Sequence, residues 1–304
     1  MVLITGLAGH SGRWLADRLS RERYSGAIRC TLRPSSDARF LDNAQLDVSK
    51  CTGDIADSRF LDQILKGVDT VLHIASIKFS SSIVEAAIRN GVPRAILVHT
   101  TGRFSKFKSA ADGYTRIEDG ILALRDKIAV TILRPTMIYG SSRDQNMYKL
   151  VDYLYRHRFF PIFGSGNNLM QPVHARDLGN AYYDVLMNPD ATKNREYDLS
   201  GKEPIKYIDL VRTVSRALGK KNILVPVPMT LSLLAAKTYS RLSANAQISV
   251  EQVLRMSEDK AFSHDSATRD FGYNPLGFEE GIEGEVREYL ETRGNSARNS
   301  FART

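Results

Sequence analysis

The stretch Val2-Leu3-Ile4-Thr5-Gly6-Leu7-Ala8-Gly9-His10-Ser11-Gly12 decides the fold of this 304-residue chain. An apolar, β-branched run predicts a strand, and three regularly spaced glycines lead from it into a helical pattern. Gly6 permits a tight turn, Gly9 lets a pyrophosphate approach the backbone, and Gly12 allows the helix to pack closely on the strand. The helix start adds unpaired N–H groups and a positive dipole end. We therefore predict that this turn binds a dinucleotide; a purely structural turn is the alternative.

Short β-branched runs alternate with helical patterns through the first half of the chain. The predicted strands are residues 2–5, 28–32, 70–74, 95–99 and 130–133. The predicted helices between them are residues 13–23, 59–65, 82–90 and 114–125. This alternation is typical of βαβ units, whose helices cover both faces of a parallel sheet. The sequence thus predicts the α/β class, with a Rossmann-type doubly wound parallel sheet.

The pattern changes after Gly140 into a polar loop, an aromatic-rich helix at 147–157 and a glycine-rich turn at 163–167. A helix at 177–187 and a strand at 196–199 then return the chain to the first domain. We predict a dinucleotide-binding domain of residues 1–141 and 170–201. A smaller, mostly helical substrate-binding domain takes residues 142–169 and 202–304, with a polar, disordered end at 295–304. Residues 225–242 are predicted to form a buried helix of this domain; an interfacial helix, with Lys237 and Arg241, is the alternative.

The composition is that of an ordinary globular protein with a basic surface. Lys and Arg number 42 against 34 acidic residues, a net charge of +8 that suits anionic substrates and phosphorylated cofactors. These charges are scattered, which argues against nucleic-acid binding. Cys30 and Cys51 show no ligand spacing, so no metal site is predicted. The longest apolar run, 223–236, falls short of the about 18 residues of a membrane-spanning helix, and no basic leader is present; we expect a cytoplasmic protein.

Five motifs extend the argument beyond the glycine turn. They are the Gly-x-x-Gly-x-x-Gly spacing, Gly53-Asp54-Ile55, His73-Ile74-Ala75, Leu133-Arg134-Pro135-Thr136-Met137-Ile138-Tyr139-Gly140 and Pro172-Val173-His174-Ala175-Arg176-Asp177-Leu178. Together they resemble the extended or atypical short-chain dehydrogenase/reductases, the NAD-dependent epimerase/dehydratase family. The resemblance implies a nicotinamide dinucleotide bound by Gly6, Ala8, Gly9, His10, Ser11, Gly12, Asp54, Ile55, Ile74, Ala75, Ser76, Pro135, Thr136 and Ile138.

The end of the second predicted strand bears on the choice between NAD and NADP. An acidic residue there favours the ribose hydroxyls of NAD. This chain instead has Arg33, with Ser35 and Ser36 beside it. A guanidinium with neighbouring hydroxyls suits a 2′-phosphate, so NADP is the preferred cofactor and NAD the alternative.

The catalytic residues implied by the resemblance are incomplete. The family pairs a Ser or Thr with a Tyr and with a Lys four residues after that Tyr, and the Lys stabilises the phenolate. Thr101 and Tyr114 match the first two, but Glu118 stands where the Lys is expected. A carboxylate one helical turn away disfavours a phenolate, although it is able to accept hydrogen bonds from a ribose. Lys106 or Lys108 is an alternative source of positive charge.

The segment after Gly140 indicates the substrate. The predicted substrate-binding residues are Lys78, Arg143, Asn146 and Gln171. By the same resemblance, basic and amide side chains there suit the diphosphate of a nucleotide-sugar; a polar connection beside a packed aromatic helix is the alternative. Two functions stay open. One is an NADP-dependent oxidoreductase or epimerase-like enzyme acting on a nucleotide-sugar or related hydroxyl or carbonyl compound, which could form a homodimer. The other is a non-catalytic dinucleotide-binding protein with a structural, sensing or assembly role.

Overall fold

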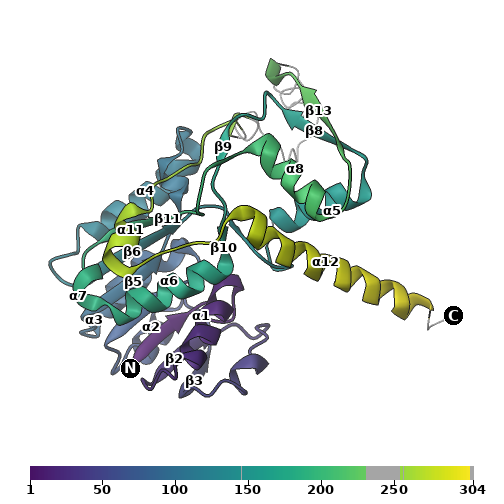
Figure 1. Cartoon of the computed structure of the whole chain (residues 1–304). Helices are drawn as coiled ribbons and strands as arrows, with labels where there is room; N and C mark the ends of the chain where they lie inside the picture. Colours follow the sequence, from purple (N-terminus) through teal and green to yellow (C-terminus); the bar gives the residue numbers. More distant parts are fainter. Residues whose placement is uncertain (145, 231–253, 256, 302–304) are drawn as a thin grey trace.

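The computed structural model describes residues 1–144, 146–230, 254–255 and 257–301. Its main feature is a seven-stranded parallel sheet with the order β11-β6-β5-β4-β1-β2-β3 (Figure 1). The strands are β1 (Val2–Thr5), β2 (Ile28–Leu32), β3 (Val48–Thr52), β4 (Thr70–His73), β5 (Arg94–Val98), β6 (Ala129–Pro135) and β11 (Glu196–Leu199). The strand order reverses between β1 and β4. This doubly wound topology confirms the predicted fold class and places a binding crevice at the carboxyl ends of those two strands.

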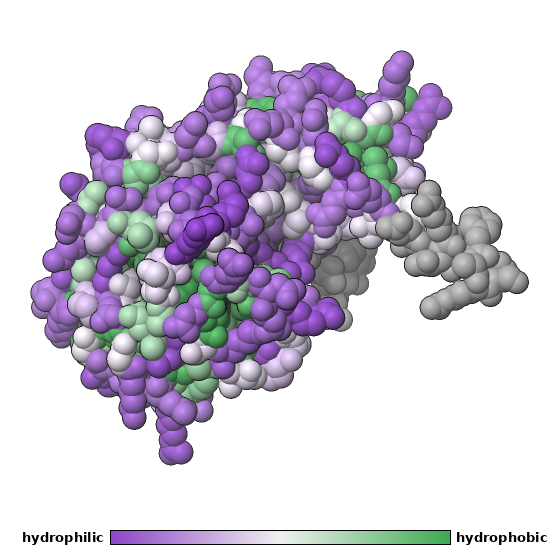
Figure 2. Space-filling model, turned by 60° about the horizontal axis from the view of Figure 1, so that its bottom comes forward, coloured by the Kyte–Doolittle hydropathy of each residue, from purple (hydrophilic) through white to green (hydrophobic). Residues whose placement is uncertain are grey.

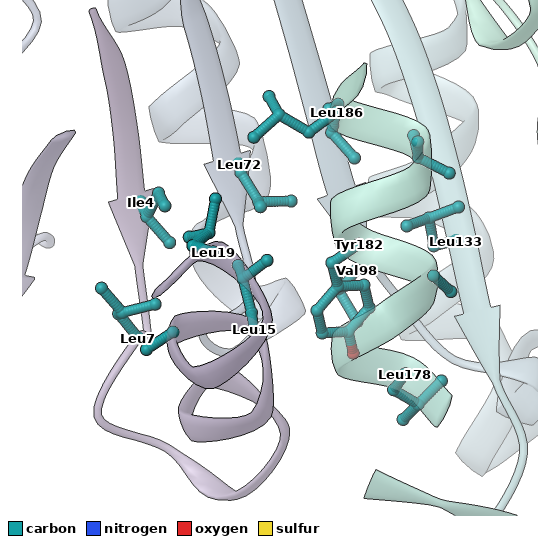
Figure 3. Close-up of a cluster of buried hydrophobic side chains, with 14 of the residues drawn as sticks. Ile4, Leu7, Leu15, Leu19, Leu72, Val98, Leu133, Leu178, Tyr182 and Leu186 are labelled. Atoms are coloured by element: carbon teal, nitrogen blue, oxygen red, sulfur yellow. The ribbon is translucent and has the colours of Figure 1, made fainter. Parts of the chain in front are cut away.

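Helices cover both faces of the sheet. One face carries α1 (His10–Arg21) and α6 (Ala175–Met187), and the other carries α2 (Ser58–Ile64), α3 (Ser80–Arg89) and α4 (Lys108–Leu122). Because side chains alternate along a strand, Val2 and Ile4 join the core under α1 and α6, whereas Leu3 joins the core on the opposite face. Figure 3 shows Leu15 of α1 and Tyr182 of α6 pointing toward the strand residues of the first core. Packing in these two cores holds β1 and α1 in place, and with them the turn that connects β1 to α1.

A second part of the molecule has its own apolar core. It is built from α5 (Met147–Arg156), α8 (Tyr207–Ala217) and α12 (Phe278–Phe301), with three two-stranded sheets. These sheets pair β7 (Ile138–Tyr139) with β10 (Val173–His174), β9 (Leu169–Met170) with β12 (Ile205–Lys206), and β8 (Phe159–Phe163) with β13 (Ile223–Val227). Tyr139 and Met170, from the predicted first domain, belong to this core. The domain boundaries proposed from the sequence therefore remain predictions.

Three elements differ from the sequence-based expectation. The edge strand β3 was not predicted because its residues are half-buried or exposed and include Lys50. The end predicted to be disordered is instead helical as far as Phe301, since α12 continues from a well-packed first half. Within the segment 225–242, the first residues belong to strand β13, and residues 231–242 lie outside the described part of the chain.

Short elements complete the described chain. They are the 3₁₀ turns η1 (Arg39–Leu41), η2 (Ile77–Phe79) and η3 (Thr101–Phe104), and the helices α7 (Pro189–Thr192) and α11 (Asp265–Phe271). Figure 2 shows hydrophilic residues over most of one face, with smaller hydrophobic areas between them. Within the described residues, no helix combines the length and the apolarity needed to cross a membrane.

Candidate functional site

The turn between β1 and α1 is closed by its own backbone. Gly6 has a φ of +79°, which L side chains rarely adopt, and the Gly9 amide donates to the Gly6 carbonyl at 2.9 Å. A Cβ on Gly12 would lie 2.7 Å from the carbonyl oxygen of Leu7 and closer still to that of Gly6. Gly6 itself approaches the next strand, because a Cβ there would lie 2.9 Å from the Ala75 nitrogen. The glycines thus allow the loop, α1 and the end of β4 to meet without side chains between them.

A buried histidine fixes the end of β4 against this turn. The Nδ1 atom of His73 lies 2.6 Å from the Thr5 hydroxyl, and its Nε2 lies 3.1 Å from the Ser76 carbonyl. Burial lowers the pKa of His73 to about 4, so the ring is neutral at physiological pH. Since a carbonyl only accepts, Nε2 donates to Ser76 and Nδ1 accepts from Thr5. The predicted cofactor residues Ile74, Ala75 and Ser76 are therefore held beside the glycine turn.

The amino-terminal end of α1 is open to an anion. Gly9 is the N-cap and no side chain caps the helix, so the first-turn amides have no competing carboxylate. His10 follows, with its Nε2 atom buried and without a partner in the described structure. Burial lowers the pKa of His10, and the nearby Asp144 opposes this shift. The turn therefore has the shape and the donors that a dinucleotide pyrophosphate requires. The predicted Ser11 lies deeper, where its hydroxyl accepts from Tyr182 at 3.3 Å.

The end of β2 carries the predicted 2′-phosphate site. Arg33 is exposed and makes no ion pair within the described residues, and its backbone forms a turn with Ser36. The sequence analysis missed Arg13, which extends from α1 to the carbonyl of Asp37 at 2.8 Å and lies over the Phe40 ring. Two guanidinium groups thus flank this loop. The signal for Arg13 was its place immediately after the last glycine of the turn.

A cavity of about 560 Å³ adjoins the glycine turn and gathers part of the predicted site. Its lining takes His10 from the turn, Thr101 from η3, and the segment 136–138 after β6. The predicted residues Thr136, Ile138, Arg143 and Asn146 also line it. A second hollow, between α8 and α12, contains none of the predicted site residues. The cavity is therefore the candidate active site.

The far wall of the cavity was not predicted. It is formed by the segment after the undescribed stretch, with Arg255, Glu258, Asp259, Lys260 and Phe262. Gln171 positions this segment: its Oε1 accepts from the Phe262 amide at 2.9 Å and its Nε2 donates to the Gly201 carbonyl at 2.7 Å. Because both ends of its amide are used inside the protein, Gln171 supports the wall and is not free to bind substrate, contrary to our expectation. No local motif marks residues 255–262, and their place at the cavity could not be predicted from the sequence.

Comparison with known proteins shows what the chain is similar to. Residues 2–109 match the model of the NAD dependent epimerase/dehydratase family. The chain is also similar to extended, epimerase-like short-chain dehydrogenase/reductases. It is 23% identical to short-chain dehydrogenase/reductase family 42E member 1 of Bos taurus, over 76% of this chain and 75% of the relative. It is also 23% identical to N-acetyl-alpha-D-glucosaminyl-diphospho-ditrans,octacis-undecaprenol 4-epimerase of Escherichia coli O157:H7, over 63% of this chain and 67% of the relative.

Solved structures share the fold. UDP-glucuronic acid 4-epimerase from Bacillus cereus, in complex with UDP-glucuronic acid and NAD, is 16% identical, with a TM-score of 0.73 over 96% of this chain and 99% of that chain. The dTDP-glucose 4,6-dehydratase of Streptomyces venezuelae, with NAD bound, is 19% identical, with a TM-score of 0.73 over 96% of this chain and 98% of that chain. These neighbours confirm the epimerase-type architecture.

Relative to the family pattern, the hydroxyl residue is in place and the tyrosine is displaced from the cavity. Thr101 lines the cavity, and its hydroxyl donates to the Pro135 carbonyl at 3.3 Å. Tyr114 does not line it, although its ring lies close to Gly102, where an added Cβ would be 3.3 Å away. The structure thus brings Thr101 to the candidate active site and leaves Tyr114 behind η3.

Glu118 corrects the sequence-based interpretation most clearly. Its carboxylate is fully buried, accepts from His99 Nδ1 at 2.8 Å and Arg134 Nε at 2.9 Å, and also pairs with Arg103. Although burial alone would raise it, the hydrogen bonds and charge of His99 and Arg134 lower the pKa of Glu118 to about 2. It is therefore an ionised structural group between α4, β5 and β6. It does not line the cavity.

Two further predicted residues lie apart from the cavity. Lys78 is exposed in η2, and Lys106 is exposed after η3 with only its backbone amide bound, to Glu258 at 2.6 Å. Asp54 is exposed at the end of β3, where its carboxylate accepts from the Ala56 amide at 2.9 Å. Gly53 donates to the Leu32 carbonyl at 3.2 Å, so Asp54 and Ile55 lie near the predicted 2′-phosphate loop. Within the described chain, no group of three or more His, Cys, Asp or Glu side chains is arranged to hold a metal ion.

Proposed function

We propose that this protein is an oxidoreductase that binds a nicotinamide dinucleotide, preferably NADP, and acts at a hydroxyl or carbonyl carbon of a nucleotide-sugar or related compound. One observation carries the proposal. One cavity is lined by His10 at the open amino-terminal end of α1, by Thr101, and by Arg143 and Arg255. It therefore offers a helix amino-terminus for an anion, a hydroxyl and two guanidinium groups in one place.

The residues have separate tasks in this proposal. The turn from Gly6 to Gly12 holds the pyrophosphate through backbone amides, and Arg33, Ser35 and Ser36 hold the 2′-phosphate. When bound, the dinucleotide supplies or accepts the hydride. The Thr101 hydroxyl at the start of η3 donates its proton to the Pro135 carbonyl, so its oxygen is held in place and orients the substrate oxygen by accepting a hydrogen bond from a substrate hydroxyl. The guanidinium groups of Arg143 and Arg255 suit the two phosphates of a nucleotide-sugar. Two structures of similar fold contain such compounds, one UDP-glucose and the other UDP-glucuronic acid.

A second function, dinucleotide binding without turnover, is favoured by a different observation. The position that carries a catalytic lysine in the family pattern holds Glu118, and this carboxylate is locked in ion pairs beneath α4. Tyr114 also stands outside the cavity wall. A protein with an intact cofactor turn and an altered tyrosine pair would still bind the dinucleotide tightly. Both functions include dinucleotide binding, so only a measurement of turnover distinguishes the enzyme from the non-catalytic protein.

Calorimetric titration with NADPH and NADH tests cofactor binding and preference. We expect tighter binding of NADPH, and we expect Arg33→Ala to narrow the difference by ~1.5–3 kcal/mol, the scale of a hydrogen bond to a charged group. Arg59→Ala, which removes an exposed arginine of α2, is the control and should change neither affinity. Equal loss of both affinities in Arg33→Ala would remove the assigned role of Arg33.

Turnover is then measured with UDP-glucose, UDP-glucuronic acid and dTDP-glucose as probes. Each sugar nucleotide is incubated with the dinucleotide-loaded protein, and products are separated by chromatography. Conversion of any probe supports the oxidoreductase. Tight dinucleotide binding with no conversion of any probe favours the non-catalytic function.

A further inference from the structure

A lysine that the family pattern does not use borders the candidate active site. The backbone of Lys260 is bound to strand β9. Its amide donates to the Leu169 carbonyl at 2.7 Å, and Lys260 forms a parallel β-bridge with Met170. Two residues later, Phe262 is held at both ends of its peptide, by Gln171 and by the Ser200 hydroxyl at 2.7 Å. The backbone that carries Lys260 is therefore fixed, and its side chain borders the same cavity as Thr101 and His10.

The ammonium group of Lys260 has no hydrogen-bond acceptor and no ion pair within the described residues. The two carboxylates next to it in the chain are already engaged. Glu258 accepts from the Ser105 hydroxyl at 2.9 Å and from the Lys106 amide, and Asp259 accepts from the Leu169 amide at 2.7 Å. Lys260 is thus a cation at the cavity wall whose own donors remain available.

The surroundings of Lys260 favour proton exchange. Burial lowers the pKa of Lys260, Arg255 lowers it further, and Glu258 opposes both. Arg143, His10 and Asp144 line the same cavity. The Asp144 carboxylate is occupied by three backbone amides at the start of α5, among them that of Met147 at 2.8 Å. Glu258 and Asp144 at the cavity wall accept hydrogen bonds from other groups, and neither forms an ion pair with Lys260 within the described residues.

We propose that Lys260 is a catalytic residue, the acid and base that exchanges a proton with the substrate oxygen oriented by Thr101, in place of the lysine that α4 lacks. The proposal rests on the oxidoreductase function proposed above. It is carried by position: Thr101 and Lys260 border one cavity, whereas Glu118 and Lys106 do not.

The proton balance for a carbonyl substrate is simple. The carbonyl carbon gains a hydride from a reduced nicotinamide dinucleotide, which is thereby oxidised, and the C=O π electrons move to oxygen. The Lys260 ammonium gives that oxygen a proton, so one N–H bond breaks as the O–H bond forms. The neutral amine regains a proton from water. In the reverse direction the neutral amine accepts the hydroxyl proton.

Competitive labelling with trace acetic anhydride tests the proposal without a substrate. Acetylation of Lys260 is followed by peptide mass spectrometry across a pH series, with and without saturating NADPH. The matched control is Lys206, an exposed lysine on β12, which pairs with the other side of β9. We expect Lys260 to be labelled with a midpoint at lower pH than Lys206, and NADPH to protect Lys260 but not Lys206. Equal midpoints, or no protection although calorimetry shows NADPH binding, overturn the proposal.

Turnover provides the second arm. With whichever sugar-nucleotide probe is converted, we expect Lys260→Met to lower kcat by about 10²–10⁴-fold while the NADPH affinity stays within about twofold, as for loss of an acid–base group. Lys260→Arg should retain the fold and the affinity but shift the pH profile, and Lys206→Met should leave both unchanged. An unaltered kcat in Lys260→Met refutes the role of Lys260 alone. Absence of NADPH binding in the parent protein refutes the proposed function itself.

Discussion

At the scale of single residues, Glu118 shows how burial decides a role. It stands on α4, one helical turn after Tyr114, which suggested a carboxylate beside a phenol. In the folded protein it instead neutralises Arg134, whose guanidinium also pairs with Glu196 and Asp198 of β11. A buried charge without such partners costs several kcal/mol. The carboxylate is therefore needed to hold α4, β6 and β11 together, and this requirement explains it without any catalytic task.

We predict that Glu118→Gln destabilises the protein in a pH-dependent manner. The folded-state pKa of about 2 lies below the ordinary value of 4.5, so the contribution is present above pH 4.5 and is lost as pH falls toward 2. At pH 7 the free energy of unfolding should fall by about 3 kcal/mol, and the difference between variant and parent should shrink at pH 3. Urea unfolding followed by circular dichroism measures this. Asp119→Asn, at the exposed next residue, is the control and should cost far less; equal losses would contradict the assignment.

At the scale of elements, the junction of β1 and α1 is the part most sensitive to small changes. Gly12 lies in the first turn of α1, directly against the carbonyl oxygens of the loop. These are backbone atoms that cannot rotate away, so even one methyl group would displace the helix from the strand. The same displacement would move the amide donors proposed to bind the pyrophosphate.

We predict that Gly12→Ala abolishes measurable dinucleotide binding and lowers the free energy of unfolding by about 1–3 kcal/mol, the scale of an overpacked core. Gly120→Ala is the matched control, since it lies within α4 with nothing within 4 Å of an added Cβ. That substitution should stabilise the protein by roughly 0.5–1 kcal/mol through helix propensity. Calorimetric titration and thermal unfolding read out both variants. If Gly12→Ala bound the dinucleotide with wild-type affinity, the proposed binding of the dinucleotide by this turn would be wrong.

At the scale of the whole molecule, α12 connects the second core to the candidate active site. Its fully buried Glu285 accepts from the Gly140 amide at 2.7 Å, at the point where the chain leaves β7. Burial and the neighbouring Asp144 raise the pKa of Glu285 to about 8. Asp144 in turn borders the cavity beside His10. The contact between α12 and the loop after β7 is therefore sensitive to pH near neutrality.

We predict that Glu285→Gln stabilises the protein above neutral pH. The pKa of Glu285 in the folded protein is raised above its ordinary value of 4.5. The contribution of Glu285 to the free energy of unfolding of the parent protein is therefore fully present below pH 4.5 and is lost as pH rises through about 8. The amide side chain of the variant is neutral at every pH. The free energy of unfolding of the variant should therefore exceed that of the parent by almost nothing at pH 4.5 and by on the order of 3 kcal/mol at pH 8. Thermal unfolding across that range measures it, with Glu291→Gln on the exposed side of α12 as control. A gain that does not change with pH would contradict the mechanism.

Much of the fold, and several of the residues that line the cavity, followed from local sequence. The strand–glycine–helix pattern, the alternation of elements and the motif around Arg134 are short-range signals. They predicted the glycine turn and five residues that the structure places at one cavity: Thr101, Thr136, Ile138, Arg143 and Asn146. Edge strand β3 was not predicted from the sequence because its half-buried and exposed residues do not form an apolar run. Gln171 was placed correctly near the site but given the wrong task, since only the structure shows both ends of its amide in use.

The sequence by itself determined a doubly wound α/β protein with a glycine turn after its first strand, because periodicity and glycine spacing act within about ten residues. Tertiary structure alone decided which charges meet. It joins Glu118 to Arg134 across two elements, and it brings Lys260 into one cavity with His10. Such pairings depend on how strands and helices pack and on the free-energy cost of burying a charge. The spacing of residues along the chain predicts neither the packing nor this cost.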